Sequence, residues 1–203
     1  MDNMVSFKER VRQVAINESQ NYKEIFLDYD YLICFDSLSI KRFYLITATE
    51  KNYAHLIGVN IKCSPYDFFV KCTDGSLMET DFDFVKPGQN EEDVKGTVRR
   101  KIMSLEKMKN FFKSKIFVEE SFKRNKIMCA IAASDSNITI GFSSGGKSYP
   151  KTLLKGNELS SNAVEPSLIF RKSKSSDLFS ELIYGDKNDI SYYANMINHL
   201  ITT

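Results

Sequence analysis

Residues 127–142 read IMCAIAASDSNITIGF, which is the pattern of two short strands around a turn. Ile127–Ala133 and Asn137–Phe142 are short apolar runs with the alternation of strands, and Asp135-Ser136-Asn137 between them is a turn signal. Similar short runs occur on both sides of this hairpin, at 116–122, 167–172 and 178–184. The second half of the chain is therefore predicted to form an antiparallel sheet.

Helical periodicity dominates the first half of the chain. One apolar stripe runs through residues 4–29, and a second runs through 95–113. Shorter elements lie between these two helices and at the C-terminus. We expect strands at 31–35 and 43–47, a helix over 50–57 that Gly58 ends, a helix over 64–72 with Pro65 at its first position, a polar loop at 87–93, and a last helix over 190–201.

Helices first and strands afterwards predict an α+β fold, with the N-terminal and central helices packed on a twisted antiparallel sheet. The length of 203 residues fits one domain. We expect a single domain over 1–203, with an N-terminal helix at 1–30, a core at about 40–185 and a C-terminal helix at 190–203.

Composition argues against several classes of protein. The four cysteines form no C-x-x-C pair, and with two histidines the chain offers no zinc-ligand spacing, so no metal and no cofactor are expected. The N-terminus lacks an apolar leader, and no apolar run approaches the roughly 20 residues that span a bilayer. We expect a cytoplasmic protein that does not contact membranes.

Charge is segregated although the net charge is only +2. Residues 74–93 hold seven acidic residues and one lysine, whereas 95–115 hold eight basic residues and one acidic residue. Residues 141–175 are also basic. Segregated basic segments favour a surface that faces a polyanion, and the alternative is two solvated faces that balance each other. The acidic segment is interpreted as a solvated loop; neutralisation of the basic helix and mimicry of nucleic acid are the alternatives.

Residues 141–148, GFSSGGKS, match the phosphate-binding P-loop pattern letter for letter. A working P-loop is followed by a helix whose first amides hold the phosphates. Here Tyr149-Pro150 follows at once, and proline disfavours a helical Tyr149. We therefore predict a hairpin tip and not a nucleotide site, with Lys147 placed to meet a phosphate of a polymer.

Two stretches beside this loop carry a family resemblance. EKNYAHLIGV (50–59) contains an aromatic-x-His-Leu-x-Gly segment, and YPKTLLK (149–155) contains a Pro-x-Thr-Leu-Leu segment after a predicted strand. Their order resembles the phage nuclease-like families grouped as Barnase–EndoU–Colicin–RelE-like, in particular the fourth phage group. The resemblance spans roughly residues 40–185. Ile57 departs from it, since threonine is frequent there.

The resemblance implies a RelE/barnase-like fold and metal-independent RNA cleavage, in a phage or prophage protein that acts in the cytoplasm of a bacterial host. Targets in the wider superfamily include tRNA and mRNA, and toxins of this kind have antitoxin partners. The alternative is a non-catalytic protein of the same fold that binds a host protein or nucleic acid. The motif carries over Lys151 and Thr152 as site residues.

RNA cleavage without a metal needs a base, an acid and cations that stabilise the phosphate. His55 titrates nearest to neutral pH and is the predicted base or acid; the alternative is a buried structural histidine. A second histidine, His199, lies in the terminal helix, and Tyr53 and Tyr149 are alternative acids.

Lysines and arginines supply the remaining predicted contacts. If 151–155 is extended, Lys151, Leu153 and Lys155 share one face and Thr152 lies on the other. Lys151 would stabilise the phosphate, with Thr152 helping to orient it. The predicted nucleic-acid contacts are Arg99, Arg100, Lys101, Lys147, Lys155 and Arg171.

Overall fold

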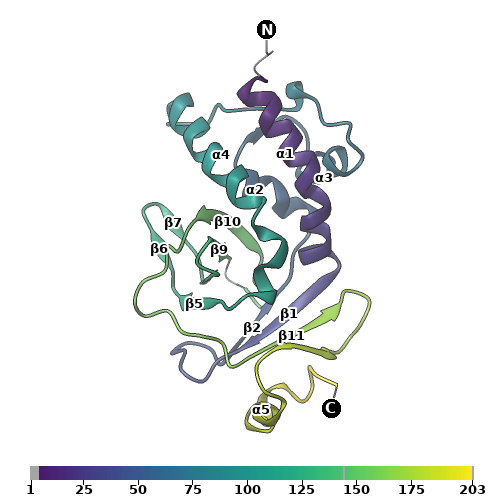
Figure 1. Cartoon of the computed structure of the whole chain (residues 1–203), viewed down its shortest axis with the longest axis vertical. Coiled ribbons are helices and arrows are strands. Elements are labelled where there is room, and N and C mark those ends of the chain that lie inside the picture. Colours follow the sequence, from purple (N-terminus) through teal and green to yellow (C-terminus); the bar gives the residue numbers. More distant parts are fainter. Residues whose placement is uncertain (1–4, 144, 203) are drawn as a thin grey trace.

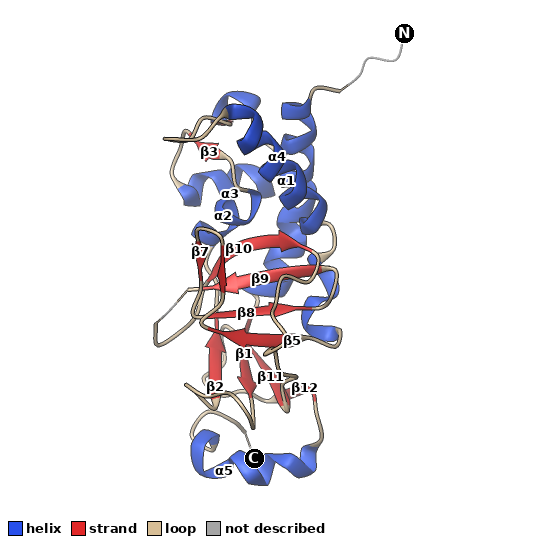
Figure 2. Ribbon diagram, turned by 90° about the vertical axis from the view of Figure 1, so that its left-hand side faces the viewer, coloured by secondary structure: helices blue, strands red, loops and turns tan. Residues whose placement is uncertain are grey.

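The computed structural model describes residues 5–143 and 145–202. Four helices gather at one end of the molecule, the strands lie in the middle, and the last helix covers the opposite end (Figures 1 and 2). Among the described residues, no helix combines the length and apolar character needed to cross a membrane. The helices are α1 (Phe7–Tyr22), α2 (Tyr53–Ile57), α3 (Pro65–Thr73), α4 (Glu91–Leu105) and α5 (Ile190–Ile197).

Shorter helical turns extend or connect these helices. α1 continues into one π-helical turn, and the chain after α4 forms a long 3-10 segment. The turns are η1 (Lys23–Leu27), η2 (Glu50–Asn52), η3 (Glu79–Asp81), η4 (Met108–Lys113) and η5 (Lys187–Asp189).

Local sequence explains where the helices begin. The Ser6 hydroxyl accepts the amide of Glu9 at the start of α1, and Ser64 caps α3, whose first residue is Pro65 as predicted. α4 begins at Glu91 because Asn90 accepts the amide of Glu92. The predicted loop at 87–93 is therefore too long, since its acidic end forms the first helical turn, where negative charge is stabilised.

The strands form two four-stranded antiparallel sheets rather than the single sheet that the sequence predicts. Sheet I has the order β10-β9-β8-β5, and sheet II has the order β12-β11-β1-β2. Their strands are β5 (Phe117–Glu120), β8 (Ile131–Ser134), β9 (Ile138–Phe142) and β10 (Pro150–Lys155) in sheet I, and β1 (Tyr29–Cys34), β2 (Phe43–Ile46), β11 (Leu168–Ser173) and β12 (Glu181–Tyr184) in sheet II.

Two small two-stranded sheets accompany the larger ones. β3 (Asn60–Ile61) pairs with β4 (Phe82–Asp83), and β6 (Lys123–Arg124) pairs with β7 (Ile127–Met128). The predicted strand 127–133 is thus broken, with β7 in the β6–β7 hairpin and β8 in sheet I.

The acidic segment 74–93 is paired with nearby lysines, because Lys71 contacts Asp81 and Lys62 contacts Asp83.

Sheet II has apolar side chains on both faces. Tyr31 and Ile33 of β1 face the main core, whereas Leu32 and Cys34 face a second cluster that α5 covers. In sheet I, Ile138, Ile140 and Phe142 point into the main core. The two sheets meet where Ser148 forms a parallel bridge with Ile46.

The loop before β10 does not lead into a helix. Pro150 opens β10, which pairs antiparallel with β9, so GFSSGGKS joins two adjacent strands. The prediction of a hairpin in place of a P-loop is confirmed. Ser144 lies outside the described residues.

Candidate nucleic-acid interface

β10 is the edge strand of sheet I, and helices from the first half of the chain pack against it. Both α2 and α4 contact β10, which brings the 50–59 and 149–155 stretches together. These three elements carry most of the predicted site residues: His55 on α2, Arg99, Arg100 and Lys101 on α4, and Lys151, Thr152 and Lys155 on β10.

Two lysines donate hydrogen bonds to carbonyl groups at the C-terminus of α2. Gly58 takes a left-handed conformation with φ of 85°, and its amide donates to the carbonyl of Ala54. The ammonium of Lys101 donates to the carbonyl oxygen of His55 at 2.7 Å, and the ammonium of Lys86 donates to the carbonyl oxygen of Gly58. Positive charge at this end of a helix stabilises the exposed carbonyl groups.

This arrangement lowers the pKa of both His55 and Lys101. Burial lowers the pKa of His55, and the charges of Lys101 and Lys86 lower it further. Burial also lowers the pKa of Lys101 to about 7, with a smaller contribution from Lys86. The lowered pKa of His55 favours its neutral imidazole, and Lys101 titrates near pH 7.

A pocket of about 380 Å³ lies between α4 and the end of β10. Its lining includes the basic residues Arg100, Lys101, Lys155 and Arg124. The apolar Leu153 and Leu154 of β10 also line it. Glu158, the one carboxylate among the described lining residues, is paired with Arg124 at 2.6 Å. The pocket therefore presents excess positive charge to solvent.

A β-bulge between Pro150 and Thr152 changes the direction of Lys151. The Lys151 ammonium donates to the carbonyl oxygen of Met128 at 2.8 Å, beside Cys129 and Lys123 in a second pocket of about 410 Å³. The predicted common face of Lys151, Leu153 and Lys155 is wrong for Lys151, because Leu153 points into the main core. Lys151 lines the far side of the edge strand.

Thr152 is only 6% exposed. It lies opposite Gly141, and an added Cβ on that glycine would stand 2.9 Å from the Thr152 methyl group. Thr152 is thus buried against sheet I, whereas its neighbour Lys151 reaches the surface.

Three predicted contacts lie elsewhere. Arg99, the neighbour of Arg100, stacks over the Phe7 ring at 5.0 Å. The Lys147 ammonium lies 3.9 Å from the buried carboxylate of Asp30. Arg171 binds Glu181 through two hydrogen bonds, of 2.6 and 2.7 Å, on sheet II. The structure does not bring these three residues to β10.

The second histidine and the alternative acids are also separated from His55. His199 follows α5 at the opposite end of the molecule from α2 (Figures 1 and 2). Tyr53 is fully buried, and its hydroxyl donates to the carbonyl of Ala15 at 2.7 Å. Tyr149 is half-buried beside β10.

Three cations of the site were not anticipated from the sequence: Lys86 at the end of α2, and Lys123 and Arg124 beside β10. Lys86 lies in the acidic segment, and the other two form the short strand β6. No local pattern distinguishes them from other surface cations, because their positions depend on the packing of distant segments.

Comparison with known proteins finds a family for this chain. A family described as phage-Barnase-EndoU-ColicinE5/D-RelE like nuclease4 matches residues 16–195. The chain belongs to this family. The resemblance seen in two short motifs therefore extends over most of the chain, and nucleic acid is the substrate class of this nuclease family. No curated protein and no solved structure matches the chain.

Proposed function

We propose that this member of the nuclease family cleaves RNA without a metal. A ribose 2′-hydroxyl loses its proton and attacks the adjacent phosphate, the bond from phosphorus to the 5′-oxygen breaks, and the 5′-oxygen leaves with a proton, giving a 2′,3′-cyclic phosphate and a 5′-hydroxyl. The observation that carries the proposal is the position of His55 on α2 beside Lys101 of α4 and Lys86, whose charges add to burial in lowering the pKa of the imidazole. A neutral imidazole accepts the 2′-hydroxyl proton, and nearby ammonium and guanidinium groups stabilise the phosphate.

The other residues take roles that follow from their positions. Arg100, Lys101 and Lys155 line the pocket beside α4 and would hold the RNA backbone. Lys151 lies on the other side of β10, so its role in stabilising the pentavalent phosphate would require the RNA to cross this edge strand. Thr152 is buried, so it would act through the placement of Lys151 and not by touching RNA.

The test uses the two histidines as a matched pair. Purified wild type, His55→Ala, His199→Ala and Lys151→Ala are incubated with total bacterial RNA in EDTA, and fragment ends are mapped. We expect discrete cyclic-phosphate ends from wild type and His199→Ala, a loss of about 100-fold or more in His55→Ala, and about tenfold or more in Lys151→Ala.

Two outcomes would contradict the proposal. Unchanged cleavage by folded His55→Ala would remove His55 from the chemistry. Intact RNA with every folded variant, wild type included, would favour a non-catalytic member of the family that binds a host protein or nucleic acid.

A further inference from the structure

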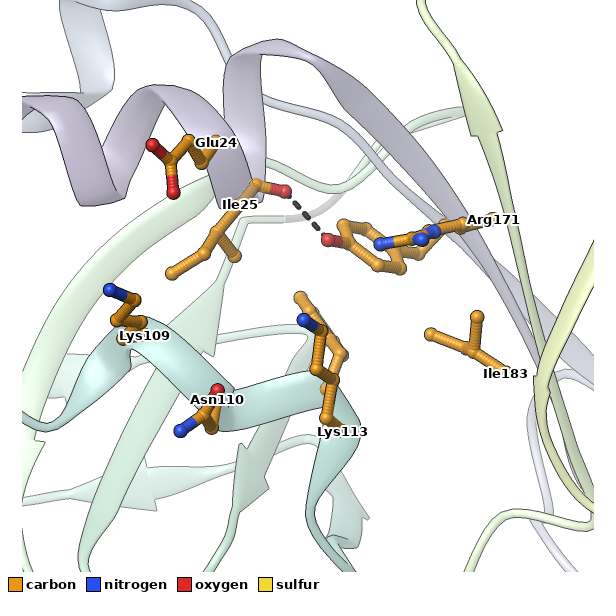
Figure 3. Close-up of a pocket in the computed structure, with 9 residues that line it drawn as sticks. Glu24, Ile25, Lys109, Asn110, Lys113, Arg171 and Ile183 are labelled. Carbon is orange, nitrogen blue, oxygen red and sulfur yellow. Dashed lines mark hydrogen bonds between the residues drawn. The ribbon is translucent and has the colours of Figure 1, made fainter.

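A separate pocket lies between η1, η4 and sheet II (Figure 3). Its volume is about 90 Å³, and its lining includes Lys109, Lys113 and Arg171. Both lysines rise from η4, whereas Arg171 enters from β11 (Figure 3). The pocket shares no lining residue with the two pockets beside β10.

The cations of this pocket are not neutralised equally. Within the described part of the chain, neither Lys109 nor Lys113 has a carboxylate within ion-pair distance, and both are exposed. Arg171 is fixed by Glu181 and by the Tyr29 ring, which lies 4.3 Å from its guanidinium carbon. Those bonds use Nε and Nη2, so Nη1 is free of the Glu181 pairing. The two lysines therefore have no ion-pair partner in the described chain, whereas Arg171 is held by Glu181 and Tyr29.

The floor of the pocket is rigid and adds no charge. Tyr31 stacks on Phe112 with ring centroids 4.0 Å apart, and both residues are buried. The Tyr31 hydroxyl donates a hydrogen bond of 2.7 Å to the carbonyl oxygen of Ile25 (dashed line in Figure 3). Glu24 is the one carboxylate among the described residues that line the pocket. Cations outnumber it, and the cavity has space for a compact anion but not for a base.

We propose that this pocket binds a phosphoryl group, with Lys109, Lys113 and Arg171 as its donors. Tetrahedral oxyanions match this set, because flexible ammonium groups adapt to an oxygen while a fixed guanidinium orients it. The phosphoryl group belongs either to a nucleic-acid backbone or to free phosphate. The site stands independently of the reaction proposed at β10.

The test is an NMR titration of ¹⁵N-labelled His55→Ala protein with inorganic phosphate at constant ionic strength, followed at the amides of Lys109, Lys113 and Arg171. We expect saturable shifts at these positions. Adding Lys109→Gln and Lys113→Gln together should weaken phosphate binding about threefold to tenfold. Adding Lys187→Gln instead, at an exposed lysine of η5, should leave the affinity unchanged.

A third variant separates binding from loss of structure. Glu24→Gln removes the carboxylate of the pocket and should tighten phosphate binding, which a damaged fold would not do. The site is disproved if these amides do not respond to phosphate, or if the double lysine variant and Glu24→Gln both keep the parent affinity.

A competition arm identifies the source of the phosphoryl group. A 2′-O-methyl oligoribonucleotide is added to the phosphate-saturated protein. Displacement of phosphate from these amides supports the site and assigns it to a nucleic-acid backbone. Continued phosphate binding in the presence of bound oligonucleotide supports the site and assigns it to free phosphate.

Discussion

Lys101 of α4 donates a hydrogen bond of 2.7 Å to the carbonyl oxygen of His55 on α2, so a side chain of α4 caps the C-terminus of α2. This contact places a residue of the basic 95–115 segment beside the motif histidine. It also explains the glycine of that motif, since the Lys101 side chain crosses directly over Gly58. An added Cβ on Gly58 would stand 2.7 Å from Lys101 Cδ.

Gly58→Ala is expected to destabilise the protein by about 2 kcal/mol or more, because alanine meets both a left-handed backbone and the Lys101 stem. Chemical denaturation measures the free energy of unfolding. Gly75→Ala is the control, since φ there is 78° with nothing within 4 Å, and it should lose about 1–2 kcal/mol. Equal losses at both glycines would refute the role of Lys101 crowding.

Stability is expected to rise with pH above neutrality through Lys101. Its pKa is about 7 in the folded protein and about 10.4 in an unfolded chain, so between these values the unfolded state binds more protons. Urea titrations of wild type and Lys101→Met at pH 6 and pH 9 measure the effect. As pH rises, the free energy of unfolding of wild type should increase relative to that of Lys101→Met. A constant difference would show that Lys101 stays charged.

Glu120 is expected to hold the 36–42 loop to sheet I. Its carboxylate accepts the amides of Ser39, Ile40 and Lys41 at 3.0 Å each, and the Tyr44 hydroxyl at 2.6 Å. Glu120→Gln should cost about 1–3 kcal/mol in unfolding free energy.

The Glu120 contribution also depends on pH. These hydrogen bonds lower its pKa below the ordinary glutamate value although burial opposes them. Stability from Glu120 is therefore complete above the ordinary value and is lost as pH falls through the lowered pKa. Glu91→Gln, at an exposed residue whose ion pair in the described part of the chain is with Lys95, should cost under about 0.5 kcal/mol. If the two variants lose the same stability, the loop contact contributes nothing.

Two adjacent arginines are expected to differ in RNA binding. Arg100 lines the pocket beside β10, whereas Arg99 stacks over Phe7. In a His55→Ala background, Arg100→Gln should reduce the slope of log affinity against log salt by about 0.7, as expected for one contact to single-stranded phosphate. Arg99→Gln should leave that slope close to its parent value. Fluorescence anisotropy at several salt concentrations distinguishes them, and equal slopes would argue against an interface at the pocket.

The α+β class and most element positions were predictable because local periodicity and capping report them. The helix that Gly58 ends, the helix that Ser64 caps and the hairpin after β9 were all predicted and are confirmed. The division into two sheets was not predictable. The β1 strand has apolar residues on both faces, and alternation alone does not say which strands pair.

The site residues divide in the same way. The family resemblance selected Lys151 and Thr152, the titration range of histidine together with its motif selected His55, and charge counting selected the α4 cations. Packing made neighbouring residues different: Arg99 and Arg100 face different surroundings, and a bulge turns Lys151 from the face of Leu153. The lowered pKa of His55 and the lowered pKa of Lys101 depend on burial and on Lys86, 31 residues after His55 in the chain. Desolvation and long-range charge arise when distant segments pack together, so they exist only in the folded protein.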